Sequence, residues 1–190
     1  GIARYIREEY DFDRRRSIIE SDSAYSDDVW RQFSELGWLS IPFDESYGGF
    51  GGHADDLAGV MLELGKGLII EPYMSTVVVF GSLLNSSNND SLKEQLIPRI
   101  IKGQYKGSFA YAEEQSRFEI SDVKTSAQKC GDGYKLNGTK IAVIDAKESD
   151  GLIVTARTGG SQYGAEGISL FLVDTSAEGV AVSSLSLIHI

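Results

Sequence analysis

The sequence predicts an α+β protein in which an all-helical domain is followed by an antiparallel, β-barrel-like domain. In the first half of the 190-residue chain, apolar residues recur with helical spacing. In the second half, alternating residues and tight-turn dipeptides replace that pattern. Helices first and strands after, without alternation, favour segregated domains over a doubly wound sheet. The period changes near Gly107, so we expect a helical domain over residues 1–107 and a β-domain over residues 108–190.

The composition is that of an ordinary globular protein, with 42% apolar and 24% charged residues. A net charge of −10 disfavours nucleic acid as a partner, because phosphate binding needs clustered Lys and Arg. The longest apolar runs fall short of the roughly 18 residues that a membrane span needs, so no membrane partner is expected. Residues 1–10 lack the apolar core of a secretory signal. A single cysteine, Cys130, and only two histidines favour a reducing, cytoplasmic compartment and no metal site.

Four helices are predicted in the first half. Ser26 is a good N-cap for a helix from Asp27 to Leu36, and Gly37 is placed to end it. Further helical runs cover residues 57–64, 76–84 and 92–101. We expect the last of these to start from Asp90 or Ser91, with Glu94 completing a capping box.

Turn sequences and β-forming runs predict the strands of the second half. Gly131-Asp132-Gly133 and Asn137-Gly138 are tight-turn sequences, and Asn-Gly is the strongest short hairpin signal. Two runs rich in β-forming residues, Leu152–Ala156 and Ile168–Val173, predict two further strands.

Several residue patterns suggest a catalytic or binding function, but a structural role explains them equally well. The loop Gly48–Gly52 lacks the lysine and leading strand of a phosphate loop, which favours a turn. Glu113 and Glu114 are adjacent, so on a strand they point to opposite faces and cannot form an acid–base pair. Either glutamate alone remains a catalytic candidate. Ser116 has no histidine close in sequence, which gives a hydrolytic triad little support.

Motifs in matched order and spacing cover nearly the whole chain. They are Phe33–Pro42, the loop Glu45-Ser46-Tyr47-Gly48-Gly49-Phe50-Gly51, Ser108–Glu113, Gly131–Lys140 and Asp150–Arg157. Together they resemble the N-terminal and middle domains of the acyl-CoA dehydrogenases, flavoenzymes that desaturate acyl thioesters. The resemblance implies an acyl-CoA substrate and an FAD held between the middle domain and a C-terminal helical domain, reaching a neighbouring subunit.

The resemblance also implies where the chemistry lies. A carboxylate from the C-terminal domain removes the α-proton, and hydride passes to flavin N5. The present chain stops soon after Val182, so that domain is missing and we assign no catalytic residue. The final run, Leu185–Ile190, lacks the pattern of the next family strands, which predicts a truncation or a reading-frame scar.

The resemblance implies binding roles for seven positions. The implied cofactor-binding positions are Phe109, Tyr111, Ala112, Ala142, Val143 and Ile144, and the implied substrate-binding position is Phe118. The family usually has Thr where this chain has Ala112, Trp-Ile-Thr where it has Ala142-Val143-Ile144, and often Ser where it has Phe118. Losing two hydroxyl donors removes about 1 kcal/mol for each hydrogen bond, although backbone amides could retain part of the contact.

A subset of the family has such altered segments. Phe109–Glu113, Gln115-Ser116-Arg117 and Leu152–Thr158 most resemble the small subunit of hetero-oligomeric enzymes of the pimeloyl-CoA dehydrogenase type. The resemblance therefore implies FAD-dependent α,β-desaturation by an intact homo- or hetero-oligomer with another acyl-CoA dehydrogenase subunit. Two alternatives stay open: a non-catalytic structural subunit, and a different reaction on the same fold, such as an oxidase or nitroalkane-type activity.

Overall fold

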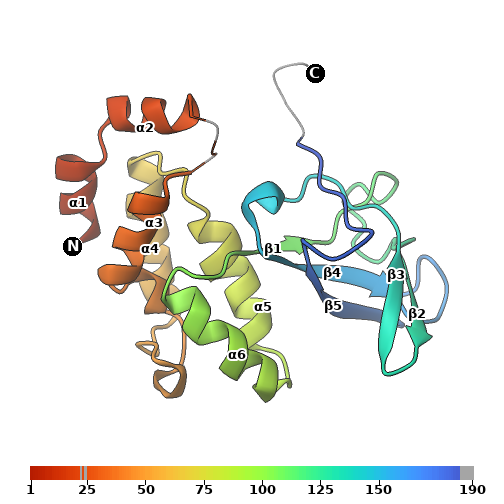
Figure 1. The fold of residues 1–190 in the computed structure, drawn as a ribbon. Helices are drawn as coiled ribbons and strands as arrows, with labels where there is room; N and C mark the ends of the chain where they lie inside the picture. The colour runs from red at the N-terminus through yellow and green to blue at the C-terminus, as the bar shows by residue number, and fades with distance from the viewer. Residues whose placement is uncertain (22, 24, 185–190) are drawn as a thin grey trace. The chain divides into compact units, whose positions relative to one another are not determined.

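A computed structural model of the chain describes residues 1–21, 23 and 25–184 (Figure 1). The chain divides into two compact units, one of residues 1–106 and one from Gly107 onward. The first unit is helical and the second carries the sheet, so the predicted fold class is confirmed. The expected truncation scar at Leu185–Ile190 lies outside the described residues.

In the described part of the helical unit there are six α-helices and three other helical segments. They are α1 (Ile2–Glu9), α2 (Phe12–Ile19), α3 (Asp27–Glu35), η1 (Trp38–Ser40), η2 (Glu45–Tyr47), α4 (Ala54–Lys66), η3 (Met74–Phe80), α5 (Gly81–Asn85) and α6 (Asp90–Ile101). Helix α3 begins as predicted, because Ser26 Oγ accepts a hydrogen bond from the Val29 amide at 3.4 Å. It also ends as predicted, at Gly37, whose φ of 75° favours glycine.

Two helices differ in detail from the prediction. Helix α6 starts at Asp90, one of the two predicted positions. Its cap, however, is Asn89, whose side chain accepts from the Leu92 amide at 3.0 Å, rather than the predicted capping box with Glu94. Asn, Asp and Ser cap helices about equally well, so the sequence Asn-Asp-Ser does not say which one is used. The predicted helix over 76–84 is a π-helix, η3, that runs directly into α5.

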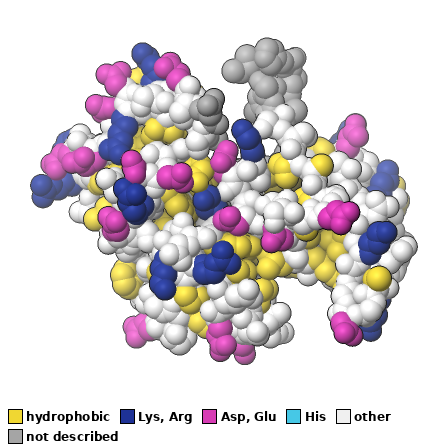
Figure 2. Space-filling view, in the orientation of Figure 1, with side chains coloured by type: hydrophobic (Ala, Val, Ile, Leu, Met, Phe, Trp, Pro, Cys, Tyr) yellow, Lys and Arg dark blue, Asp and Glu magenta, His cyan; other side chains and the backbone are white. Residues whose placement is uncertain are grey.

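An aromatic cluster forms the centre of the helical unit. Phe33 lies 4.9 Å from Trp38 between ring centroids, and Tyr5 meets Trp38 edge-on at 5.2 Å. Such pairs add to the free energy of burying the rings. On the face drawn in Figure 2, acidic and basic side chains are interspersed over the surface of this unit. No helix among the described residues is long and apolar enough to cross a membrane.

The helical unit also buries a carboxyl group. Glu71 is 5% exposed, and its Oε1 accepts one long hydrogen bond, 3.4 Å, from the Ser26 amide. Within the described part of the chain, its Oε2 has no hydrogen-bond partner. Burial therefore raises the pKa of Glu71 above its ordinary value.

A five-stranded sheet forms the second unit. Its strands are β1 (Gly107–Ala110), β2 (Ser126–Cys130), β3 (Gly133–Asn137), β4 (Gly151–Arg157) and β5 (Ile168–Asp174), with the 3₁₀ turn η4 (Ala146–Glu148) before β4. Strand β4 pairs in antiparallel fashion with β5 and in parallel with β1, and it meets β2 in one parallel bridge. Over the described residues the sheet is open and mixed rather than wholly antiparallel. A parallel pair needs a long crossover, which the chain between β1 and β4 supplies.

Of the two predicted turns, the one at Gly131 is a hairpin turn and the one at Asn137-Gly138 is not. Strands β2 and β3 form a hairpin that turns at Gly131-Asp132, where Gly131 has a φ of 60°. Asn137-Gly138 is not a hairpin turn, because β3 ends there and no strand follows until β4. A Cβ on Gly138 would lie 2.7 Å from the Thr125 Cα, so glycine is needed there for close packing.

Strand β4 is the centre of this unit. Residues 151–156 are buried on both faces, whereas the outer strand β5 is only partly buried along its length. Leu152 and Val154 form a core with Ala110 of β1, and Val143 packs against that core from the irregular segment after β3. This contact positions the segment that carries the second set of predicted site residues.

Candidate functional site

Two irregular segments lie side by side at one end of β1. The first, residues 111–113, continues directly from β1, and the second, residues 138–144, follows β3. They are joined by a hydrogen bond of 2.9 Å from the Ile141 amide to the Ala112 carbonyl. The structure thus brings together the two groups of residues that the sequence marks as cofactor-binding, although they are far apart in the chain.

Aromatic side chains cover the first segment. The rings of Phe109 and Tyr111 stack with centroids 5.2 Å apart and planes inclined by 26°. Tyr111 is 48% exposed, so part of this residue is accessible to solvent. Both rings line an apolar pocket of about 290 Å³, completed by Ile120, Ser121, Thr155, Ala165 and Ile168.

The second segment turns sharply at Ala142, which has a φ of 51°. A non-glycine residue in this left-handed region is strained by roughly 1–2 kcal/mol. The turn directs Val143 into the core and leaves Ile141 and Ile144 41% and 56% exposed. Of the three predicted residues here, only Ala142 and Ile144 therefore present side chains at the surface.

Main-chain N–H groups without a hydrogen-bond partner among the described residues lie along both segments. No hydrogen bond within the described part of the chain uses the N–H groups of Ala112, Ala142, Val143 or Ile144. Ala112 and Val143 are half-buried, and Ala142 and Ile144 are exposed. These donors suit a planar ligand with several acceptor atoms along one edge, which is the chemistry of an isoalloxazine ring. Any fit to FAD would therefore rest on the backbone, because the side chains of Ala112, Ala142, Val143 and Ile144 carry no hydroxyl groups.

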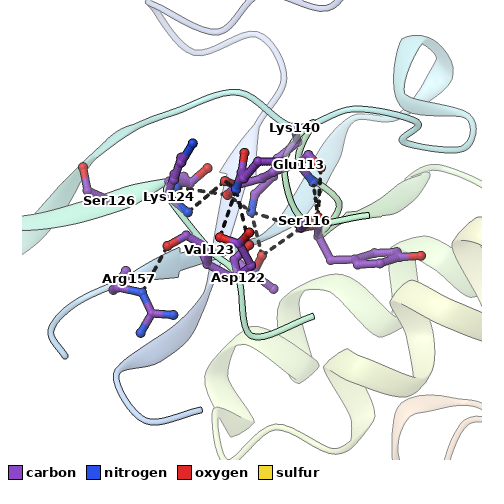
Figure 3. Close-up of polar contacts among 12 residues, drawn as sticks. Glu113, Ser116, Asp122, Val123, Lys124, Ser126, Lys140 and Arg157 are labelled. Carbon is purple, nitrogen blue, oxygen red and sulfur yellow. Dashed lines mark hydrogen bonds and ion pairs between the residues drawn. The ribbon is translucent and has the colours of Figure 1, made fainter. Parts of the chain in front are cut away.

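The buried carboxylate of Glu113 joins residues of several loops through hydrogen bonds (Figure 3). Glu113 is 3% exposed and accepts four hydrogen bonds of 2.7 to 3.0 Å, from Lys140 Nζ, Gln115 Nε2 and the amides of Lys124 and Thr125. Burial alone would raise the pKa of Glu113, but these donors outweigh burial and hold its pKa at about 2. Glu114, its neighbour, is exposed.

Lys140 is the cationic partner of that carboxylate. Its side chain is 8% exposed, and the Nζ–Oε1 distance to Glu113 is 2.7 Å. The same ammonium group donates to Thr155 Oγ1 at 2.8 Å and to the Tyr111 carbonyl at 3.2 Å. Burial lowers the pKa of Lys140, while Glu113 opposes that change.

A second cation holds the loops around the pocket. The Arg157 guanidinium donates to the carbonyls of Ser121 and Gln162 at 2.8 Å. Its Nε donates to the Val123 carbonyl at 3.1 Å (Figure 3). Further bonds reach the carbonyls of Glu166 at 2.9 Å and Gly164 at 3.1 Å. The planar, multiply donating guanidinium suits this role better than an ammonium.

The substrate position inferred from sequence lies away from the pocket. Phe118 is fully exposed in the turn after Glu113, whereas Ile120 and Ser121 line the pocket. Sequence reasoning overlooked Lys140, Thr155 and Arg157. The signal available for Lys140 was its place two residues before Ala142, the first of the flavin-like residues in the second segment. No group of three or more His, Cys, Asp or Glu residues in the described ranges could hold a metal ion.

The fold defines the class of protein as α+β, with a helical unit before an open, mixed sheet. Residues 2–104 match the acyl-CoA dehydrogenase N-terminal domain, and residues 108–187 match the acyl-CoA dehydrogenase middle domain. The chain therefore belongs to the acyl-CoA dehydrogenase family.

Individual relatives agree with that assignment. The chain is 29% identical over 168 residues to the probable acyl-CoA dehydrogenase YngJ of Bacillus subtilis, covering 87% of this chain and 44% of YngJ. It is 31% identical over 160 residues to the mitochondrial isovaleryl-CoA dehydrogenase of Pongo abelii, covering 82% of this chain and 38% of that protein. The chain thus spans less than half the length of these dehydrogenases.

Solved structures share the fold. The ChsE4–ChsE5 complex from Mycobacterium tuberculosis has a TM-score of 0.85 at 24% identity, covering 97% of this chain and 48% of its own. An FAD complex of PigA has a TM-score of 0.81 at 24% identity, with coverages of 94% and 47%.

Proposed function

We propose that the intact protein containing this chain catalyses FAD-dependent α,β-dehydrogenation of an acyl-CoA thioester, within a homo- or hetero-oligomer. Family membership supports the reaction class. The observation that carries the proposal is the junction of the two segments through the Ile141–Ala112 hydrogen bond. On both sides of it are main-chain donors with no partner in the part of the chain that the structure describes.

The chain's own residues would bind and orient the flavin. The N–H groups of Ala112, Ala142, Val143 and Ile144 would donate to acceptor atoms of the isoalloxazine, and the Phe109 and Tyr111 rings would supply an apolar wall beside it. FAD, when bound, supplies the hydride acceptor. Phe118, being exposed, would contribute to acyl-CoA binding only where a ligand or another domain covers it.

Glu113 is a poor candidate for the base that removes the α-proton. A general base works best when its pKa lies near the working pH. The pKa of Glu113 is held at about 2, and its carboxylate is enclosed by four donors. We therefore give Glu113 a structural role and assign the base to no described residue.

The test uses the native oligomer that contains this chain. We expect a flavin absorption spectrum in the purified assembly and reduction of an artificial electron acceptor that depends on added acyl-CoA. An assembly that shows neither signal would reject the proposal.

A second candidate function is a structural subunit that stabilises an active paralogue, as in the small subunit of a pimeloyl-CoA dehydrogenase type of pair. It is favoured by the small or apolar side chains at Ala112, Ala142 and Ile144, none of which can donate a hydrogen bond. Flavin stoichiometry separates the two functions. One FAD for each chain supports two working sites, whereas one FAD for each heterodimer supports scaffolding.

A further inference from the structure

Lys140 makes contacts that the binding of a flavin does not by itself require. Its ammonium group donates to the carbonyl of Tyr111, the carboxylate of Glu113 and the hydroxyl of Thr155. Two of these acceptors belong to the first segment and the third belongs to β4. One buried group therefore ties the second segment both to the first and to the central strand.

The next residue adds a second hydrogen-bonded connection, or tie, between the two segments. The Ile141 amide bonds to the Ala112 carbonyl at 2.9 Å, directly after Lys140. Among the described residues, these are the hydrogen bonds that join residues 109–113 to residues 138–144. The unpaired N–H groups of Ala112 and Ala142 lie one residue from these ties along the chain.

Stability alone is a weak reason for this ion pair. Replacing a buried ion pair with apolar residues of similar volume is often neutral or stabilising, because desolvation offsets the Coulomb attraction. An ammonium group has three donors, and Lys140 directs them to three different groups. That geometry fixes a relative position, which an apolar side chain cannot do as specifically.

We propose that Lys140, with Glu113, is a positioning residue that sets the separation of the two flavin-facing segments. This inference rests on the proposed function. The pair touches no reacting atom. It acts by holding the N–H groups of Ala112 and Ala142 at the spacing that one planar ring requires.

The first experiment compares FAD affinity in the native assembly. In Lys140→Met we expect the FAD dissociation constant to rise by about tenfold, the effect of losing one charged hydrogen-bond tie. The matched control is Lys66→Met, which removes an exposed ion pair to Glu63 of 2.6 Å. The control should change FAD affinity by less than about twofold, because exposed pairs contribute little. An unchanged FAD affinity in Lys140→Met would overturn the inference.

A double variant separates positioning from folding. Lys140→Met leaves Glu113 buried and unpaired, so its melting temperature should fall. Glu113→Gln combined with Lys140→Met removes that charge and should recover much of the melting temperature. We expect FAD affinity to stay low in the double variant, because the tie to the Tyr111 carbonyl is still absent. Recovery of FAD affinity together with stability would show that the pair only supports folding.

Amide hydrogen exchange at Ile141 tests the tie without flavin. We expect exchange about tenfold faster in Lys140→Met and in the double variant, and unchanged exchange in Lys66→Met. Equal exchange in all proteins would reject the positioning role. A wild-type assembly that binds no FAD would reject the proposed function and the flavin role with it, while the exchange rates would still decide whether Lys140 joins the segments.

Discussion

Two buried carboxyl groups of the chain have opposite electrostatic environments. Glu113 is surrounded by four donors, which hold its pKa at about 2. Among the described residues Glu71 accepts one long hydrogen bond, from the Ser26 amide, and burial raises its pKa. Neither environment was predictable from the sequence, because each depends on donors brought in from distant segments. The sequence did identify Glu113 as a residue to consider, but as a catalytic group rather than a structural one.

Glu113→Gln should change the pH dependence of unfolding. A carboxyl whose pKa is depressed in the folded state stabilises the fold above its ordinary pKa of 4.5 and loses that effect as the pH falls toward 2. We expect wild-type stability to drop across that window and the variant to show a flatter profile. At pH 7 the variant should lose about 3–5 kcal/mol, because Lys140 is left unpaired. Urea unfolding between pH 2.5 and pH 7, chosen as test conditions, measures both effects, and parallel profiles would contradict the prediction.

Ala142→Gly should stabilise the second unit. Ala142 has a φ of 51°, which glycine adopts without the Cβ penalty. We expect a gain of about 1 kcal/mol in the free energy of unfolding, since glycine also adds disorder to the unfolded chain. Ala177→Gly, at an exposed position without a positive φ, is the matched control and should not stabilise. A loss of stability in Ala142→Gly would show that the observed backbone turn is wrong.

At the scale of the elements, local patterns were predictable and pairings were not. The cap and end of α3, the strands β4 and β5 and the turn at Gly131 follow from residues next to one another in the chain. The parallel pairing of β1 with β4 depends on segments separated by a whole hairpin. Asn137-Gly138 misled the prediction because glycine serves close packing as well as turns. The adjacency of the two site segments was predictable only through the family resemblance.

Arg157→Lys should loosen the two loops that Arg157 holds, one with Ser121 and Val123 and the other with Gln162 and Glu166. Arg157 donates to carbonyls in both loops, and a lysine offers fewer donors in a less rigid arrangement. We expect a loss of about 2 kcal/mol in stability. Exchange should be faster at the Val123 amide, which bonds to the Gln162 carbonyl at 3.2 Å. The control, Arg31→Lys, changes an exposed ion pair with Asp28 and should alter stability by less than about 0.5 kcal/mol. Unchanged exchange at Val123 would contradict the role given to Arg157.

At the scale of the whole molecule, each unit has a core of its own. Phe33 is fully buried in the helical unit, and Val154 is buried in the sheet unit. The division into helices and strands was predictable because apolar periodicity reports on each segment locally. The shape of the binding surface was not, because it depends on contacts among loops.

Truncating one core should leave the amides of the other unit protected. We expect Phe33→Ala to cost about 3–5 kcal/mol and to speed exchange in α3, with little change in β4. Val154→Ala is the reciprocal variant and should speed exchange in β4 more than in α3. Equal acceleration in both units for either variant would show that they unfold as one cooperative body.

The parallel pairing of β1 with β4 also has a kinetic consequence. The β2–β3 and β4–β5 hairpins join strands that are neighbours in the chain. Strand β1, in contrast, pairs with β4, and the β2–β3 hairpin lies between them in the sequence. Closing that long loop costs entropy before any contact is gained, so non-local pairings form slowly. Docking of β1 should therefore be a late event in refolding. Until it occurs, residues 109–113 have no fixed place, and affinity for a ligand should be the last native property to return.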